Sequence, residues 1–174
     1  YPSQEDEAWA AAALAGLAAL ALGPLVAQTP LLIWNASASA PIGLYRLEPG
    51  ATPIPGDRVA WRPTPVWSRW MADRNYLPEG LPLLKPLAAT APSVVCRHED
   101  RILIDGRTVA RARARDAAGR PLPRWSGCLA LGADAVFLLA PEVLDSLDGR
   151  YFGPVDRRDL LGRVVPIRVR EARR

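Results

Sequence analysis

The sequence has few of the residue types that usually hold metals. Its 174 residues include only two cysteines, Cys96 and Cys128. One pair is too small for a structural zinc site, which needs four ligands, and no further ligand set surrounds it. The pair indicates one disulfide if the protein works outside the cytoplasm, or two buried thiols in a reducing cytosol. We therefore predict neither a metal nor a cofactor.

Histidine is equally scarce. The single one, His98, lies in the charged run at residues 97–101, which is R-H-E-D-R. A histidine with four charged neighbours is typical of an exposed, solvated turn. The sequence therefore disfavours a catalytic histidine, and a general base has to come from another residue type.

The positive charge is not arranged for nucleic-acid binding. The formal net charge is +4, and arginines cluster at residues 111–115 and 168–174. A nucleic-acid interface needs a basic stripe with a recognisable reading element, and neither cluster belongs to one. The two clusters indicate a solvated turn and a basic tail, so we predict no nucleic-acid partner.

Charge is absent from the sequence between Glu7 and Arg46. A membrane-spanning helix needs about 20 mostly apolar residues, and residues 9–34 supply them. We predict a tail at residues 1–8, a membrane anchor over residues 9–34 and a β-rich domain over residues 35–174. A cleavable signal peptide and a buried core helix are the alternatives for the apolar segment.

The rest of the chain has the pattern of an all-β domain. The full sequence has 18 prolines and 13 glycines, and they are spread along the chain, which favours many short strands joined by turns. We expect an all-β domain with coiled crossings. Strands are expected at residues 42–47, 57–61, 81–87 (a strand or bend), 93–96, 135–139 and 161–169, with a hairpin over 101–109 that turns at Asp105-Gly106.

Two segments need a separate expectation. Residues 66–71 carry two tryptophans and a methionine, and aromatic content alone does not separate core packing from an apolar rim at the surface. Residues 146–154 are rich in glycine and polar side chains, and we expect them to form a polar turn.

Two serines stand where a nucleophile could be exposed. Ser37 and Ser39 follow the apolar segment and precede a Pro-x-Gly sequence at residues 41–43, which we expect to be a turn. A serine hydroxyl is a poor nucleophile until a base removes its proton. The only lysine, Lys85, lies between leucines and prolines, so we expect its side chain to be buried.

Burial would suit Lys85 to the role of that base. Removal from water disfavours the ammonium form, and a pKa lowered to about 7–8 would supply the neutral amine near neutral pH. Ser-Lys pairs of this kind are a known variant of the catalytic triad. The alternative for Lys85 is a surface lysine whose amine reaches water past an apolar stem.

Five sequence blocks in order resemble the bacterial signal peptidase family, and within it the conjugative-transfer (TraF) branch. The blocks follow the apolar segment, and the resemblance runs over nearly the whole chain. They are S-A-P-I-G-L-Y at 39–45, L-P-L-L-K-P-L at 81–87, Cys96 with I-L-I-D-G at 102–106, G-R-P-L-P-R-W-S-G-C at 119–128 and D-S-L-D-G-R-Y-F-G-P-V at 145–155. The resemblance implies a coiled β catalytic domain of the signal-peptidase and LexA type.

The resemblance also implies roles for individual residues. Ser39 would be the nucleophile, Lys85 the general base and Asp148 an aspartate that the TraF branch requires. Three further residues would assist them: Ser37 as an oxyanion donor, Ser146 as the partner that orients the lysine, and Arg150 as the partner of the aspartate. Cys96 and Cys128 would form a disulfide.

The chain departs from the family pattern at three places. Ala40 stands where signal peptidases usually carry methionine, residues 91–94 replace a Pro-Gly-Asp sequence, and residues 148–150 are Asp-Gly-Arg instead of Asp-Ser-Arg. None of these changes removes a reacting group. The second departure disfavours general leader-peptidase activity more than it disfavours the Ser-Lys pair.

These observations lead to a functional hypothesis. We predict a serine endopeptidase anchored in the bacterial inner membrane, with its catalytic domain in the periplasm. It would process pilin precursors for the conjugative transfer machinery, by hydrolysis or by cyclisation. The alternatives are a general type I signal peptidase that cleaves signal-peptide precursors, a non-catalytic scaffold of the same fold, and a LexA-like self-cleaving repressor. The apolar segment and the lack of a DNA-binding domain disfavour the last.

Overall fold

The computed structural model describes residues 31–37 and 39–170. Strands dominate it, as expected. The elements in chain order are β1 (Leu32–Asn35), β2 (Ile42–Glu48), β3 (Arg58–Trp61), α2 (Pro65–Ala72), β4 (Leu83–Thr90), β5 (Val94–His98), β6 (Arg101–Ile104), β7 (Arg107–Arg111), β8 (Gly127–Ala130), β9 (Ala135–Leu138), α3 (Gly149–Phe152), β10 (Val155–Asp156), the short 3-10 helix η2 (Arg157–Asp159) and β11 (Leu160–Arg170).

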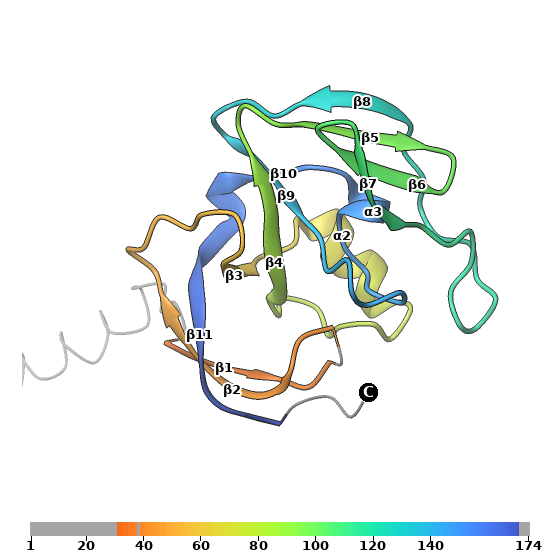
Figure 1. Cartoon of the computed structure of the whole chain (residues 1–174). Helices are drawn as coiled ribbons and strands as arrows, with labels where there is room; N and C mark the ends of the chain where they lie inside the picture. Colours follow the sequence, from red (N-terminus) through yellow and green to blue (C-terminus); the bar gives the residue numbers. More distant parts are fainter. Residues whose placement is uncertain (1–30, 38, 171–174) are drawn as a thin grey trace, which may run out of the picture. The chain divides into compact units, whose positions relative to one another are not determined.

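The strands form two sheets (Figure 1). The larger has seven strands in the order β1-β2-β11-β3-β4-β9-β10, and the smaller has four in the order β7-β6-β5-β8. Strand β4 lies in the larger sheet and leads directly into β5 of the smaller one. The expected strands at 42–47, 57–61, 81–87, 93–96, 135–139 and 161–169 are all present, with shifted ends.

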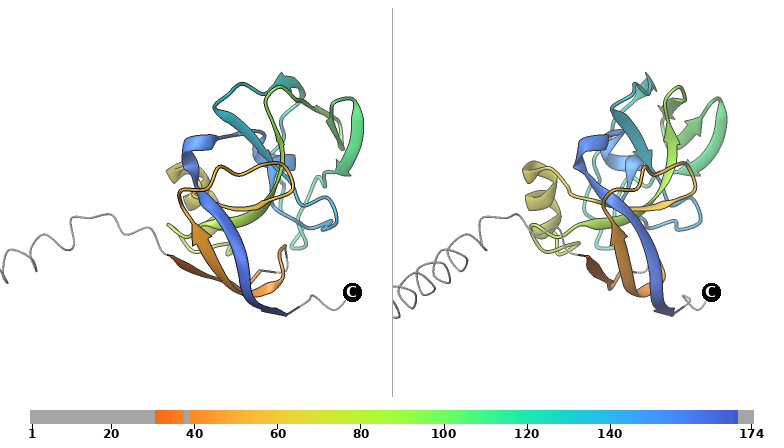
Figure 2. Two further views of the ribbon diagram at one scale, coloured as in Figure 1. Left: turned by 60° about the vertical axis from the view of Figure 1, so that its left-hand side comes forward. Right: turned by 90° about the vertical axis from the view of Figure 1, so that its left-hand side faces the viewer.

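Strand β11 lies between β2 and β3, although it comes last in the sequence among the described strands. It pairs with both of them in the antiparallel direction, and both views of Figure 2 show it (blue) along β2 (orange). The β1-β2 hairpin therefore joins the remainder of the larger sheet through β11.

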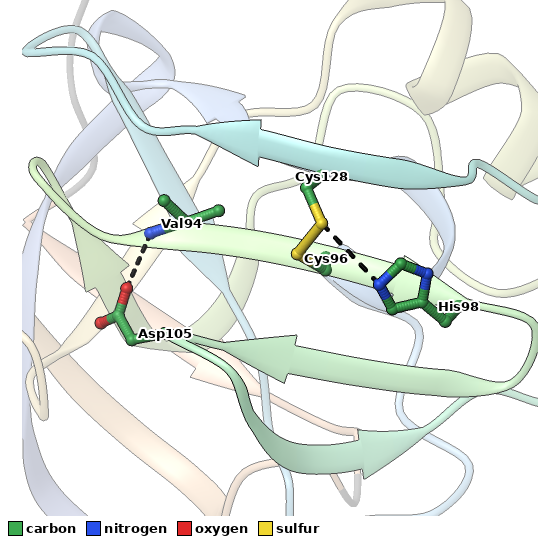
Figure 3. The surroundings of a disulfide bond; sticks show 5 residues. All are labelled: Val94, Cys96, His98, Asp105 and Cys128. Carbon is green, nitrogen blue, oxygen red and sulfur yellow. Dashed lines mark hydrogen bonds between the residues drawn. A yellow bond between two sulfur atoms is a disulfide. The ribbon is translucent and has the colours of Figure 1, made fainter.

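The predicted hairpin over residues 101–109 is present as β6 and β7. Asp105 and Gly106 both have positive φ, 51° and 78°, as a tight two-residue hairpin turn requires. The Asp105 carboxylate also accepts a 2.8 Å hydrogen bond from the Val94 backbone N–H, so this turn is tied to the start of β5 (Figure 3).

A disulfide joins β5 to β8, as predicted. Cys96 and Cys128 are directly opposite each other in the antiparallel pair, and Figure 3 shows their sulfur atoms bonded between the two strands. Of the two possibilities that the sequence left open, the structure therefore has the oxidised one. His98, at the end of β5, lies at the surface with its Nε2 atom 3.8 Å from the Cys128 Sγ.

Residues 66–71 belong to a helix, α2, which the sequence patterns did not predict. Pro65 occupies its first turn, where the missing N–H costs nothing. Met71 is fully buried, whereas Val66 is 77 % exposed. Trp67 packs edge-on against Phe152, with ring centroids 5.6 Å apart. The inward side of this segment is thus core packing, and only its outer side is exposed.

The predicted anchor at 9–34 lies mostly outside the described residues. Its last residues, Leu32–Trp34, form strand β1 and not a helix, so the boundary at residue 34 is too late. Ile33 is buried, whereas Leu32 and Trp34 are exposed, which is the two-residue alternation of a strand. Hydropathy alone cannot separate such a strand from an apolar helix. Among the helices of the described residues, none is both long and apolar enough to cross a membrane.

Candidate active site

The two serines lie in the connection between β1 and β2. Ser37 Oγ and Ser39 Oγ are 3.0 Å apart and hydrogen-bonded. At the end of the connection, the Pro41 carbonyl accepts a 2.8 Å hydrogen bond from the hydroxyl of Tyr45, a buried residue of β2. The two serines therefore lie in a short loop at the edge of the sheet, between Asn35 and Ile42, which we call the serine loop.

The Pro-x-Gly sequence after the serines is not a turn, contrary to our prediction. Ile42 and Gly43 already belong to β2, and the chain reverses before Pro41. Gly43 has a φ of +152°, and a Cβ atom there would lie 2.1 Å from the Arg168 carbonyl oxygen of β11. The glycine is needed because β11 approaches the backbone of β2 closely.

Lys85 is buried in the middle of β4, opposite Val59 of β3. Its side chain is 3 % exposed, which rules out the alternative of a surface lysine. Burial lowers the pKa of Lys85 to about 8, although the Asp148 carboxylate opposes this shift. A substantial fraction of the amine is therefore neutral slightly above neutral pH, as a general base requires.

Ser146 holds the lysine amine. Lys85 Nζ donates a buried 3.0 Å hydrogen bond to Ser146 Oγ. Ser146 comes from the loop between β9 and α3 and is itself 2 % exposed. Its backbone N–H donates to the Val143 carbonyl, which fixes the loop locally. The amine thus has one fixed partner and a lone pair left for a second group.

Asp148 and Arg150 form a buried ion pair beside this loop. Asp148 Oδ1 lies 3.5 Å from Arg150 Nε, and both side chains are almost completely buried. Asp148 also accepts backbone hydrogen bonds from Arg150 and Ala140, which ties the start of α3 to the end of β9. Burial raises the pKa of Asp148, against the opposing effect of Arg150.

Arg150 fastens the loop that carries Ser146. Its guanidinium donates hydrogen bonds to three backbone carbonyls at 2.6–3.1 Å, those of Ala140, Val143 and Leu144. The predicted polar turn at 146–154 is therefore wrong. Ser146, Asp148 and Arg150 are buried, and each side chain has hydrogen-bond partners inside the protein. Among the polar atoms of these three side chains, only Arg150 Nε lacks a hydrogen bond to the described residues, and it faces Asp148 in the ion pair.

Gly149 accounts for one departure from the family pattern. A Cβ atom at this position would lie 2.6 Å from the Phe137 ring and 2.7 Å from the Leu138 carbonyl oxygen. In this chain the close packing of α3 against β9 therefore excludes the serine of the usual Asp-Ser-Arg sequence.

Arg97 is a buried residue that sequence reasoning placed on the surface. It is 3 % exposed, and its guanidinium donates to the carbonyls of Glu99 and Arg150. The charged run at residues 97–101 gave no sign of this burial, because only the fold brings the Arg150 carbonyl within reach of Arg97. His98, in contrast, is exposed as predicted.

The serines and the lysine line one cavity of about 220 Å³. Its other walls are largely apolar and include Leu83 and Leu147. A second cavity of about 170 Å³ shares Leu147 with the first and extends towards Arg113. In the structure Ser39 bonds to Ser37, and Lys85, which lines the same cavity, bonds to Ser146. The arrangement offers a hydroxyl, a weakly basic amine and an apolar pocket.

The described residues offer one group of side chains with metal-ligand spacing, Cys96, His98 and Cys128. Both sulfurs are bonded to each other, and a disulfide lacks the thiolates that would bind a metal ion. The group therefore does not fit a metal site in this oxidation state.

The chain is similar to known proteins over most of its length. Residues 6–168 match the family described as signal peptidase, peptidase S26. The conjugal transfer protein TraF of Agrobacterium fabrum is 32 % identical over 145 residues, covering 76 % of this chain and 80 % of that protein. A plasmid transfer protein TraF of Escherichia coli is 30 % identical over 167 residues, covering 88 % and 91 %.

Among solved structures, a signal peptidase I from Enterococcus faecalis V583 matches 66 % of this chain and 98 % of its own. It is 18 % identical in sequence, with a TM-score of 0.39.

Proposed function

The chain belongs to the signal peptidase family, peptidase S26, and from this membership we propose that it is a serine endopeptidase in which Ser39 is the nucleophile and Lys85 the general base. The observation that carries the proposal is the buried amine of Lys85. It has a lowered pKa, a fixed partner in Ser146, and a place in the same cavity as the two serines.

The first step is proton transfer. Ser39 turns its hydroxyl from Ser37 to Lys85 and gives up the proton to the neutral amine as its Oγ attacks the scissile carbonyl. The Ser39 backbone N–H and the Ser37 hydroxyl stabilise the negative charge that develops on the carbonyl oxygen. The protonated Lys85 then donates to the leaving amine, and an acyl-enzyme on Ser39 remains.

The acyl-enzyme can be resolved in two ways. Attack by water gives a linear product, and attack by the N-terminal amine of the same substrate gives a cyclic one. We propose a pilin precursor as the substrate, because relatives that cover most of the chain are named as conjugal or plasmid transfer proteins. The apolar walls of the cavity suit a substrate with small uncharged side chains next to the scissile bond.

We further propose that the protein is anchored in the inner membrane, with its catalytic domain in the periplasm. The disulfide supports an oxidising compartment. Leu32 and Trp34, on the strand that leads into the serine loop, are 56 % and 67 % exposed. Such side chains are suited to the boundary of a bilayer. A substrate held in the same membrane would meet the site at a high effective concentration.

The burial of Lys85 favours catalysis over the alternative of a non-catalytic scaffold. A scaffold has no use for a buried amine, whose desolvation is costly. Asp148 and Arg150 support the catalytic assignment indirectly, because they fix the loop from which Ser146 reaches the lysine.

The test is co-expression of the full chain with a pilin precursor, followed by mass spectrometry of the pilin. Ser39→Ala and Lys85→Arg are expected to abolish processing, since arginine keeps the charge but does not act as a base. Ser126→Ala, at an exposed position, serves as the control. A cyclic product is lighter than the linear one by one water. Normal processing by either active-site variant would exclude the Ser-Lys assignment, and cleavage of many unrelated signal sequences would favour a general signal peptidase.

A further inference from the structure

The side-chain amide of Asn35 is the centre of the serine loop. Asn35 is the last residue of β1 and is 7 % exposed. Its Nδ2 group lies 2.9, 3.1 and 3.1 Å from the carbonyl oxygens of Ser37, Ala40 and Pro41, so its two hydrogens are shared among three acceptors. These carbonyls lie on both sides of Ser39 in the sequence. One buried amide therefore holds the backbone on either side of the proposed nucleophile.

The other end of the same amide holds the second serine. Asn35 Oδ1 accepts a hydrogen bond from Ser37 Oγ at 3.0 Å and one from the Ser37 backbone N–H at 3.2 Å. The orientation of the amide follows from its surroundings, because only a donor satisfies three carbonyl oxygens and only an acceptor satisfies two donors.

The hydrogen bonds in the loop consequently have a direction. A serine hydroxyl has one hydrogen, and Ser37 uses it on Asn35. In the 3.0 Å bond between the serines, Ser39 must therefore be the donor and Ser37 the acceptor. The resting order is Ser39 to Ser37 to Asn35, so the proton that catalysis must remove points at Ser37.

We propose that Asn35 is a positioning residue of the active site, which fixes the loop around Ser39 and sets the resting direction of the Ser39–Ser37–Asn35 hydrogen bonds. The proposal rests on the assignment of Ser39 as nucleophile. Asn35 touches neither substrate nor reacting atom. It acts through Ser37, whose hydroxyl must leave Asn35 Oδ1 before it can donate to the oxyanion, and through the backbone that places the Ser39 N–H.

Kinetics of Asn35→Asp form the first test. Aspartate keeps the shape and the acceptor but loses both amide hydrogens, so the three carbonyls lose their donor. With full-length protein in detergent and a fluorogenic peptide carrying alanine before the scissile bond, we expect kcat to fall on the order of 100-fold, with KM within about twofold. Asn75→Asp, the same chemical change in an exposed turn, should match the wild type. A wild-type kcat in Asn35→Asp overturns the proposal.

A thermal melt separates positioning from a general loss of fold. The kinetics are compared at a temperature where both variants remain folded, as judged by circular dichroism. If Asn35→Asp regains the wild-type kcat there, the residue is merely structural and the proposal is wrong. If Asn35→Asp does not fold at any temperature, the amide-exchange measurement, which leaves Asn35 intact, decides the proposal.

A second measurement does not need activity. The chain has two asparagines, Asn35 and Asn75, so selective ¹⁵N-asparagine labelling gives two side-chain amide groups in an NMR spectrum, each with a pair of proton signals. We expect the Asn35 amide hydrogens to exchange with solvent on the order of 100-fold more slowly than those of Asn75. Ser37→Ala should shift the Asn35 signal and leave that of Asn75 in place.

The two measurements distinguish the failure of this inference from that of the proposed function. If the wild type and Ser39→Ala are equally inactive on the peptide, the peptidase assignment fails, and amide exchange alone then decides whether Asn35 fixes the loop. If the wild type cleaves and Ser39→Ala does not, the peptidase assignment holds. Equal exchange rates for Asn35 and Asn75 would then overturn the role of Asn35 only.

Discussion

Lys85 and Ser146 are 61 residues apart in the sequence, and their Nζ and Oγ atoms meet in a buried 3.0 Å hydrogen bond. The bond joins strand β4 to the loop before α3. Because the neutral amine uses one N–H on Ser146, its lone pair remains free for the proton of Ser39. The titration of Lys85 should therefore govern activity.

We expect kcat/KM to rise with pH through an apparent pKa of about 8, the value for buried Lys85. The sign follows from the role, because only the deprotonated amine can accept a proton and deprotonation increases with pH. Rates of peptide cleavage across the range from about pH 6 to 10 measure the profile. His98→Ala should leave this pH profile unchanged. A pH profile that differs between the wild type and His98→Ala would contradict the assignment of Lys85 as the base.

Replacing Lys85 by methionine should stabilise the fold. The pKa of Lys85 falls from 10.5 to about 8 on folding, which corresponds to a burial cost of about 3 kcal/mol for the ammonium. Below about pH 8 both states are protonated and the wild type bears this cost in full. Between pH 8 and 10.5 the folded state releases its proton first, so wild-type stability rises with pH and the advantage of Lys85→Met shrinks.

Urea unfolding at several pH values checks this prediction. Arg107→Met removes a charge from an exposed strand position and should show no comparable effect. A Lys85→Met variant less stable than the wild type at pH 7 would mean that the amine is stabilised by its partners more than it is destabilised by burial.

Asp148→Asn should separate stability from activity. The change leaves the buried Arg150 charge without its partner, and losing one member of a buried ion pair costs about 3–5 kcal/mol. The Asp148 carboxylate also raises the pKa of Lys85. Its replacement by an amide should therefore move the rise of kcat/KM with pH to lower pH. Urea unfolding and the pH dependence of kcat/KM measure the two effects, with the exposed Asp134→Asn as control. A rise of kcat/KM displaced to higher pH would be inconsistent with the electrostatic effect of Asp148 on Lys85.

The disulfide should contribute to stability and not to catalysis. Cys96 and Cys128 close a loop with a sequence separation of 32, and such a cross-link contributes about 2–4 kcal/mol. We expect the double serine variant to unfold at lower denaturant concentration with unchanged kcat and KM. Two titratable thiols in wild-type protein isolated from the periplasm would show that the bond does not form there.

The residues of the motifs were identifiable from the sequence because each carries a chemical signature. Lys85 is the single lysine and lies among leucines and prolines, which correctly predicted burial and a lowered pKa. The strands were also predictable, because the alternation of apolar residues and the turn residues are local properties of the sequence. The hairpin turn at Asp105-Gly106 is the clearest case.

The errors concern residues whose environment is made by distant parts of the chain. Arg97 and Arg150 are polar in sequence but buried, because the fold provides backbone carbonyls for their guanidinium groups. Asn35 follows the apolar run, and the sequence pattern assigns it no role beyond opening the β-rich domain. Its spacing of two from Ser37 was a usable signal, since asparagine commonly bonds to the backbone two residues on. The Leu32–Trp34 strand was hidden within an apolar segment.

The place of β11 also has a consequence for biogenesis. The strand that carries Lys85 and the hairpin that carries Ser39 are held in one sheet only by the insertion of β11 between β2 and β3. A chain that emerges from a ribosome or translocon presents this strand after all the others described. The cleavage machinery would then stay unassembled during synthesis and export, and a growing chain would not meet its own nucleophile in working order.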